Sequence, residues 1–186
     1  MKVILKLLRP HQWAKNSFVF LPLFFNGKFT NLEFLFITII VFFVFSFAAS
    51  GIYCFNDILD AEKDKLHPIK RHRPIASGNI GKCSAFFIML ICFIISLLTI
   101  YFFSSYIKTH VYNLYWVIAI YILMNIFYCI KLKKMIIVDV FVIAIGFVLR
   151  IFAGGLATGI LLSHWLVLMT FLLALLLAFA KRRDDV

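Results

Sequence analysis

Long apolar stretches separated by short charged ones dominate the sequence, and their lengths predict helices that cross a membrane. A spanning helix needs ~20 mostly apolar residues. Five stretches meet this requirement, at residues 32–54, 83–103, 113–130, 135–157 and 162–180. A sixth run, about 16–26, is short and contains the helix-kinking Pro22, so it reaches spanning length only if Trp13 and its neighbours join it. We therefore predict an all-α membrane bundle with about six transmembrane helices.

The overall composition agrees with a membrane protein. Hydrophobic residues make up 64% of the 186 residues, against ~45–50% in soluble domains. This excludes a water-soluble globule, and we predict that residues 1–186 form one integral membrane domain. Four cysteines lie in or beside apolar runs without metal-ligand spacing, and we interpret them as reduced, small apolar residues. They are Cys54, Cys83, Cys92 and Cys129.

The distribution of basic residues predicts the orientation of the spans. With six spans, one side of the membrane carries 16 of the 19 Lys and Arg residues, the other carries only Lys28 and Lys108, and Arg150 lies inside a span. The positive-inside rule assigns the rich side, with both termini and the polar loop 55–82, to the cytoplasm. The net charge of +11 is therefore mainly a topology signal and does not indicate a nucleic-acid partner.

Half of the eight acidic residues lie in one short polar segment that follows the span 32–54. If the helix of that span continues at ~100° per residue, four polar side chains share one face. They are Asn56, Asp57, Asp60 and Asp64. Converging carboxylates suit Mg²⁺, a hard cation that takes oxygen ligands and shares them with substrate phosphates. The alternative is a solvated acidic turn cushioned by neighbouring lysines.

A basic segment follows the acidic one within a few residues. Lys70, Arg71 and Arg73 lie between Pro68 and Pro74, which rule out a continuous helix and predict a shaped loop. Arginine binds phosphate in a planar, bidentate fashion, and lysine supplies a point charge. Taken alone, the loop could equally be an anchor that contacts lipid headgroups. The nearby metal-ligand candidates favour a phosphate site.

Two further polar features occur towards the C-terminus. Asp139 and Arg150 lie within the span 135–157, where ionisable groups are costly and usually face a protein interior. Their spacing places both on one helix face, ~16 Å apart along the axis. A polar contact between helices is the alternative to a role in a site. After the last span, bases and acids again come together, with a cytoplasmic anchor as the alternative; they are Lys181, Arg182, Arg183, Asp184 and Asp185.

Taken in order, these motifs resemble the UbiA superfamily of intramembrane prenyltransferases. The pattern Asn56-Asp57-x-x-Asp60-x-x-x-Asp64 is similar to the first aspartate-rich motif of that family, and Arg73-Pro74-x-x-Ser77-Gly78 follows it. Within the superfamily the chain is most similar to the decaprenyl-phosphate phosphoribosyltransferase group. That similarity rests on Asp139 and on residues 8–16, 67–76, 146–150 and 181–185.

The resemblance implies a Mg²⁺-dependent enzyme that transfers phosphoribose from phosphoribosyl diphosphate to a polyprenyl phosphate and releases diphosphate. The implied catalytic residues are Asn56, Asp57, Asp60 and Asp64, of which Asn56 would orient ligands. The implied metal ligands are Asp57, Asp60, Asp64, Asp184 and Asp185. The implied phosphate-binding residues are Lys15, Lys70, Arg71, Arg73, Arg150, Lys181 and Arg182. Membrane lipids are the remaining expected partners, and nothing in the sequence indicates an oligomeric state.

Two other functions stay open. A UbiA-type aromatic prenyltransferase would share the Mg²⁺ motif and use a prenyl diphosphate, but it needs a hydrophobic acceptor pocket, whereas the strongly basic loop favours a sugar phosphate. A non-enzymatic half-bundle that binds lipid phosphate is the other alternative. The resemblance implies a fold of nine transmembrane helices, and we expect this chain to hold the first six. We therefore expect the 186-residue chain alone to be weakly active or inactive.

Overall fold

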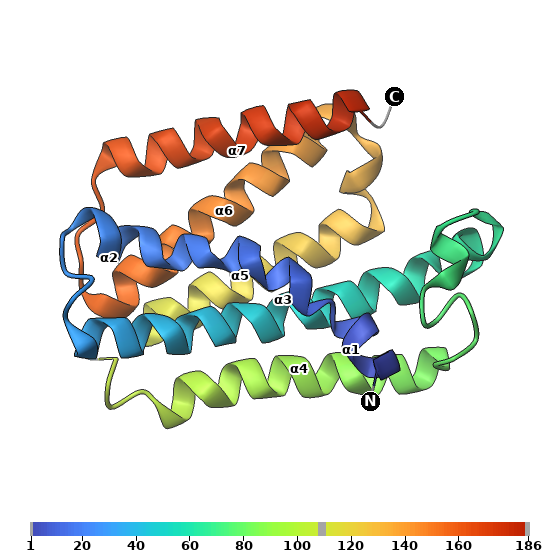
Figure 1. The fold of residues 1–186 in the computed structure, drawn as a ribbon, viewed down its shortest axis with the longest axis horizontal. Helices are drawn as coiled ribbons and strands as arrows, with labels where there is room; N and C mark the ends of the chain where they lie inside the picture. The colour runs from blue at the N-terminus through green and yellow to red at the C-terminus, as the bar shows by residue number, and fades with distance from the viewer. Residues whose placement is uncertain (1, 108–110, 185–186) are drawn as a thin grey trace.

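The computed structural model describes residues 2–107 and 111–184. Within these residues the chain is helical and contains no β-strand, which confirms the predicted all-α membrane bundle. The long helices lie side by side (Figure 1). In chain order the elements are α1 (Lys2–Leu8), the 3₁₀ helix η1 (Pro10–Phe20), α2 (Leu21–Phe25), α3 (Leu32–Leu66), η2 (Lys70–His72), α4 (Lys82–Phe102), α5 (Val111–Ile130), η3 (Leu132–Lys134), α6 (Ile136–Thr158) and α7 (His164–Asp184).

The predicted spans correspond closely to the helices. Among the described residues, four helices are long and apolar enough to cross a membrane, namely α3, α4, α5 and α6. The apolar part of α7, His164–Ala180, is shorter than these four. The ends of α4 and α6 lie one residue from the predicted limits. The hydropathy pattern therefore located these helices well.

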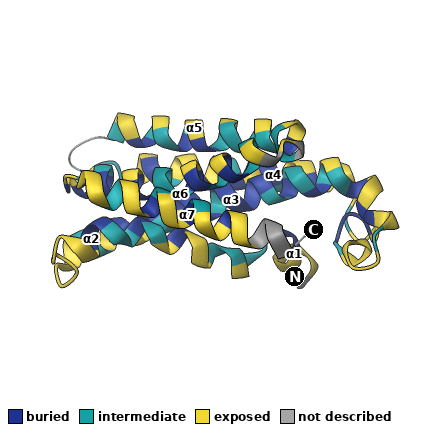
Figure 2. Cartoon of the chain, turned by 90° about the horizontal axis from the view of Figure 1, so that it is seen from above, coloured by how far each residue is buried: buried dark blue, intermediate teal, exposed yellow. Residues whose placement is uncertain are grey.

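Helix α3 is the central element of the bundle. It contacts α4, α5, α6 and η1, and Figure 2 shows its buried residues along the middle of the molecule. Val41, Val44, Phe45 and Ala48 on α3 are fully buried. The helices packed around α3 fix its direction, and they therefore fix the position of the polar residues at its end.

The polar end of α3 extends well beyond the apolar span. Asn31 caps the helix, because its side-chain oxygen accepts hydrogen bonds from the amides of Glu33 and Phe34. The helix ends at Leu66, since His67 precedes Pro68 and is extended. Its 35 residues span ~50 Å, against ~30 Å of hydrocarbon. The segment 55–82 was predicted as a loop, but it is helical up to Leu66. The acidic motif therefore lies on a continuation of the helix, as its spacing analysis assumed.

The first apolar run crosses the bundle in a different form from the other spans. Residues 10–20 form the 3₁₀ helix η1, and α2 continues it with Pro22 in its first turn. A 3₁₀ helix rises ~2.0 Å per residue, so η1 and α2 together reach ~30 Å with fewer residues than an α-helix needs. Trp13 belongs to η1, so the first apolar run does include the neighbouring residues that it needs to reach spanning length. Two hydrogen bonds fasten η1 to α3, from Trp13 to Ser50 and from Asn16 to Ser46.

The two ends of the bundle differ in the segments that they carry. In Figure 1, α1, the α3–α4 loop, the α5–α6 connection and the end of α7 lie at one end of the molecule. The α2–α3 and α6–α7 connections lie at the other end. This arrangement groups the basic segments as the six-span topology predicts.

Close packing of η1 against α6 leads to a prediction about Gly154. A Cβ atom added there would collide with the backbone carbonyl of Val19, whereas a Cβ at Gly51 would meet only the ring of Phe93. A side chain can rotate away but a carbonyl in a helix cannot, so Gly154→Ala should destabilise the protein by about 1–3 kcal/mol. Thermal unfolding of the purified protein measures this, with Gly51→Ala as the milder control. Equal losses from the two variants would contradict the expected backbone collision.

Candidate functional site

The candidate site lies where the polar end of α3 meets the α3–α4 loop. The loop is held in place by Pro74, Ile75 and Ala76, which are all buried. Ile75 packs in a small apolar cluster with residues from α1, α3 and α4, including Leu7 and Ala61. Because this anchor follows Arg73 directly, it turns the Arg73 side chain towards α3.

Arg73 joins two buried carboxylates of α3. Its Nη1 donates to Asp64 Oδ2 at 2.7 Å and to Asp57 Oδ1 at 3.3 Å. Asp57 and Asp64 are 1% and 4% exposed. Arg9 reaches the same Asp57 oxygen at 2.6 Å, and Asp57 Oδ2 is buried with no hydrogen-bond partner. Two guanidinium groups therefore neutralise this pair.

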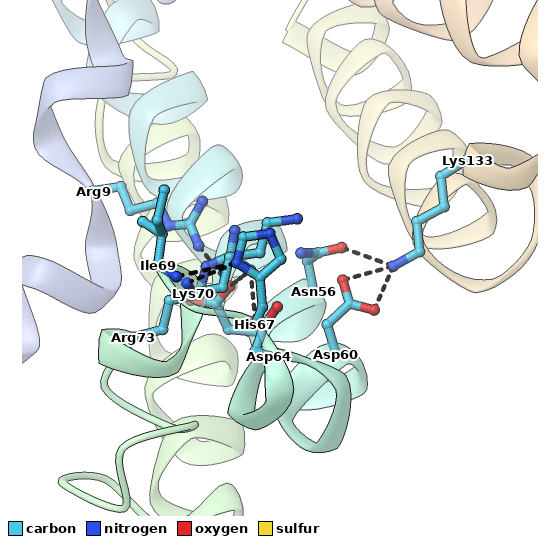
Figure 3. Close-up of polar contacts among 10 residues, drawn as sticks. Arg9, Asn56, Asp60, Asp64, His67, Ile69, Lys70, Arg73 and Lys133 are labelled. Carbon is cyan, nitrogen blue, oxygen red and sulfur yellow. Dashed lines mark hydrogen bonds and ion pairs between the residues drawn. The ribbon is translucent and has the colours of Figure 1, made fainter. Parts of the chain in front are cut away.

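Lys133 holds the other two polar side chains of the acidic motif. Its ammonium lies 2.7 Å from each carboxylate oxygen of Asp60 and 3.3 Å from Asn56 Oδ1. Figure 3 shows Asn56 and Asp60 directed towards Lys133 and away from Arg9 and Arg73. Lys133 comes from η3, the short connection between α5 and α6. The acidic motif therefore contacts cations from two different sides.

The helical geometry explains this division. Relative to Asn56, Asp60 lies ~40° around the helix, whereas Asp64 and Asp57 lie at ~80° and ~100°. All four belong to one face, as predicted from the spacing, but they occupy its two edges. One edge faces η3 and the other faces the α3–α4 loop. The face thus forms two half-sites, Asn56 with Asp60 and Asp57 with Asp64.

The donor set fits magnesium bound together with a phosphate. Within the part of the chain that the structure describes, no group of three His, Cys, Asp or Glu side chains forms a metal cage. Mg²⁺ does not require one, because it commonly binds one or two carboxylates and completes its shell with water and substrate phosphates. Both half-sites contain carboxylate oxygens, including the unpartnered Asp57 Oδ2, and Asn56 adds an amide oxygen to one of them. Metal ligation by Asp57, Asp60 and Asp64 remains a prediction.

The other predicted phosphate ligands are placed differently. Lys70 and Arg71 are exposed on the loop, and Lys15 is exposed on η1. Their assignment to phosphate binding therefore remains a prediction. Lys181, Arg182 and Asp184 lie in the last turn of α7, but their side chains are outside the described part of the chain, as is Asp185.

Asp139 and Arg150 make polar contacts between helices. Both face α5, as their spacing on one face of α6 predicts. Tyr128 donates a hydrogen bond to Asp139 at 2.7 Å, and Arg150 donates to Tyr121 at 3.0 Å. Arg150 also donates to Asn16 of η1 at 2.8 Å and to its own helix. The interhelical alternative is thus observed for both residues, and a phosphate-binding role for Arg150 remains untested.

Sequence reasoning missed two residues that the structure brings into the site. Arg9 stood in a motif used only for the family resemblance; it has a positive φ of 51°, an uncommon conformation outside glycine. Arg9 thus makes the turn that separates α1 from η1, and its side chain forms the ion pair with Asp57. Lys133 lies in a run of three basic residues that was interpreted only as a topology signal. Its partners are more than 70 positions away, so no local pattern could reveal them.

Comparison with known proteins now identifies the family. The sequence profile of the UbiA prenyltransferase family matches residues 17–185. The chain belongs to this family. Among solved structures, a UbiA homolog from Archaeoglobus fulgidus bound to GPP and Mg²⁺ superposes on the UbiA-family chain with a TM-score of 0.74 at 21% sequence identity. The match covers 93% of this chain and 60% of that one, and it supports the fold.

Several curated relatives are similar over nearly the whole UbiA-family chain. The decaprenyl-phosphate phosphoribosyltransferase of Corynebacterium glutamicum is 37% identical over 98% of this chain and 54% of its own length. The enzyme of that name from Mycobacterium tuberculosis is 34% identical over 96% of this chain and 58% of its own length. The digeranylgeranylglyceryl phosphate synthase of Sulfolobus acidocaldarius is 30% identical and is covered over 64% of its length. The chain therefore spans a little more than half the length of its first relatives.

Proposed function

We propose that this protein takes part in the Mg²⁺-dependent transfer of 5-phosphoribose from phosphoribosyl diphosphate to a polyprenyl phosphate, with release of diphosphate. The observation that carries the proposal is the pair of carboxylate half-sites, each with its own cation, at one end of a membrane bundle. The names of the relatives at 34–37% identity supply the acceptor and the transferred group. A lipid acceptor in the bilayer and a polar donor from water can meet at such an end.

The reaction needs little proton transfer from the protein. A phosphate oxygen of the lipid forms a bond to the anomeric carbon of the ribose, while the bond from that carbon to diphosphate breaks and diphosphate leaves with the electron pair. The acceptor is already an anion, so no carboxylate has to act as a base. Magnesium, when bound, neutralises charge on the leaving diphosphate.

The residues of the chain bind and orient the reactants. Asp60 and Asn56 would hold the metal-bound diphosphate from one edge of α3, and the oxygens of Asp57 from the other. Arg73, already aligned by two carboxylates, would direct its remaining donors towards phosphate. Such fixed charges stabilise a transition state without reorganising during the reaction.

A second candidate is transfer of a prenyl group from a prenyl diphosphate. Two observations favour it: one solved relative is bound to GPP and Mg²⁺, and the chain has 30% sequence identity with a digeranylgeranylglyceryl phosphate synthase. The same half-sites would then bind the diphosphate of a different donor. An aromatic acceptor is a variant of this reading.

One assay separates the candidates. Purified protein is incubated with Mg²⁺, a polyprenyl phosphate and labelled phosphoribosyl diphosphate, and in parallel with a labelled prenyl diphosphate and an aromatic acid or glycerophosphate lipid. We expect label from phosphoribosyl diphosphate to enter the lipid phase slowly, in keeping with the weak activity expected of the 186-residue chain. Label transfer only from the prenyl diphosphate would support the second candidate, and no transfer from either donor would leave a binding role.

The orientation of the site is a further prediction. The grouping of basic segments at one end of the bundle predicts that the α3–α4 loop faces the cytoplasm. In a variant without native cysteines, we expect an impermeant thiol reagent to label Lys28→Cys in intact cells. Asn79→Cys, in the loop, should react only after the membrane is opened. Labelling of Asn79→Cys in intact cells would contradict this orientation.

A further inference from the structure

We propose that Lys133 is a built-in counter-cation that occupies the metal position on Asp60 and gives it up when the metal and a diphosphate bind. In the exchanged state its ammonium would contact a phosphate oxygen of the donor. The inference deepens the proposed function, because it rests on a metal-bound diphosphate binding at these half-sites.

The contacts of Lys133 resemble those that a cation would make. An ammonium group has three donors, and the three nearest oxygens are both carboxylate oxygens of Asp60 and the side-chain oxygen of Asn56. These are also the oxygens that this half-site offers to Mg²⁺. A metal ion on these oxygens would lie close to the ammonium, and two cations at such a separation repel each other. The ammonium and the metal must therefore compete.

The two half-sites differ in how easily they can release their cation. The two cations are similarly exposed, at 25% for the Arg73 side chain and 23% for Lys133, but Asp57 and Asp64 are nearly fully buried and share one nitrogen of Arg73. Asp60 and Lys133 have side chains that are 21% and 23% exposed, so water and ions reach them. The Arg73 half-site is the fixed frame, and the Lys133 half-site is the exchangeable one.

The attachment of Lys133 allows the exchange. It lies on the three-residue helix η3, which packs against α5 and α6. Its four-carbon stem can move the ammonium away from Asp60 without any change in the backbone. A positive charge that leaves the carboxylate remains beside the diphosphate, where it adds to binding.

If Lys133 exchanges in this way, removing its charge should change two affinities in opposite directions. Loss of the lysine charge removes a competitor, so the free protein should bind divalent metal more tightly. The same loss removes a phosphate contact, so diphosphate should bind more weakly in the presence of metal. A lysine that only stabilises the fold would change the two affinities in the same direction or leave both unchanged.

The test measures Mn²⁺ binding by electron paramagnetic resonance in the purified protein, first alone and then with inorganic diphosphate. We expect Lys133→Met and Lys133→Gln to bind Mn²⁺ about fivefold more tightly than the wild type, the lower end of typical coupling between sites. They should bind diphosphate about fivefold more weakly. Lys131→Met removes an exposed charge from the same connection and should change both affinities less than twofold. In an Asp60→Asn background the gain in Mn²⁺ affinity should disappear.

Each outcome decides the proposal. Equal or weaker Mn²⁺ binding by both Lys133 variants, with circular dichroism like that of the wild type, would overturn the exchange while the proposed function stands. A gain of equal size from Lys131→Met would also overturn it, because the effect would then be general electrostatics. If neither the wild type nor the variants bind Mn²⁺ with or without diphosphate, both the exchange and the metal part of the proposed function fail.

Discussion

Replacing Asp60 by asparagine is expected to lower turnover about 100-fold or more, in line with the loss of one preorganised electrostatic contact to a transition state. Asparagine keeps the shape of the side chain but loses its negative charge. Mg²⁺-dependent binding of phosphoribosyl diphosphate should weaken as well, because Asp60 is the most accessible carboxylate of the motif. Steady-state kinetics and donor binding with and without Mg²⁺ measure the two effects.

The matched control for this variant is Glu62→Gln. Glu62 lies two residues further along the same helix, but its side chain is exposed and pairs with Lys65 and Lys82. Loss of its charge should leave turnover within about twofold of the wild type, as expected for a screened surface group. Unchanged turnover and binding in a folded Asp60→Asn variant would show that Asp60 does not bind a metal that the reaction needs.

Replacing Arg73 by methionine is expected to cost about 3–5 kcal/mol of stability. Breaking a buried ion pair from one side leaves an uncompensated charge in a medium that solvates it poorly. Asp64 should cause most of the loss, because within the described residues its ion pair is with Arg73, whereas Asp57 keeps Arg9. Thermal unfolding of the purified protein in one defined detergent measures the change.

A second variant identifies the cause of that loss. Adding Asp64→Asn to Arg73→Met removes the uncompensated charge, so the double variant should recover a large part of the stability. Lys82→Met, which breaks an exposed pair, should change the melting temperature little. If Asp64→Asn gives no recovery, the role of Arg73 is packing of the loop and not neutralisation of the carboxylates.

The sequence located most of the fold because hydrophobicity alone decides where membrane helices lie. The limits of α4 and α6 follow from the length of their apolar runs. The element that hydropathy described poorly is η1, since the number of residues needed to cross a bilayer depends on the rise per residue, and a 3₁₀ helix has a larger one. Only packing against α3 and α6 shows which helix type forms.

The site was predictable to the extent that its residues are local to one helix. Asn56, Asp57, Asp60 and Asp64 were recognisable because helical spacing places them on one face. Their division into two half-sites was not, because it depends on which cations approach each edge. Lys133 and Arg9 arrive from distant parts of the chain. Asp139 and Arg150 were correctly predicted to share one face of α6. Their tyrosine partners on α5 could be identified only from the structure.

The 3₁₀ form of η1 also sets how the protein can tolerate changes in length. With three residues per turn, side chains at i and i+3 line up without drift, so Trp13, Asn16 and Val19 form one straight row. Trp13 and Asn16 reach serines of α3, and the carbonyl of Val19 lies against Gly154 of α6. A single inserted residue would rotate every later position by ~120° and break this row. Insertions or deletions of one or two residues in η1 should therefore disrupt its packing against α3 and α6.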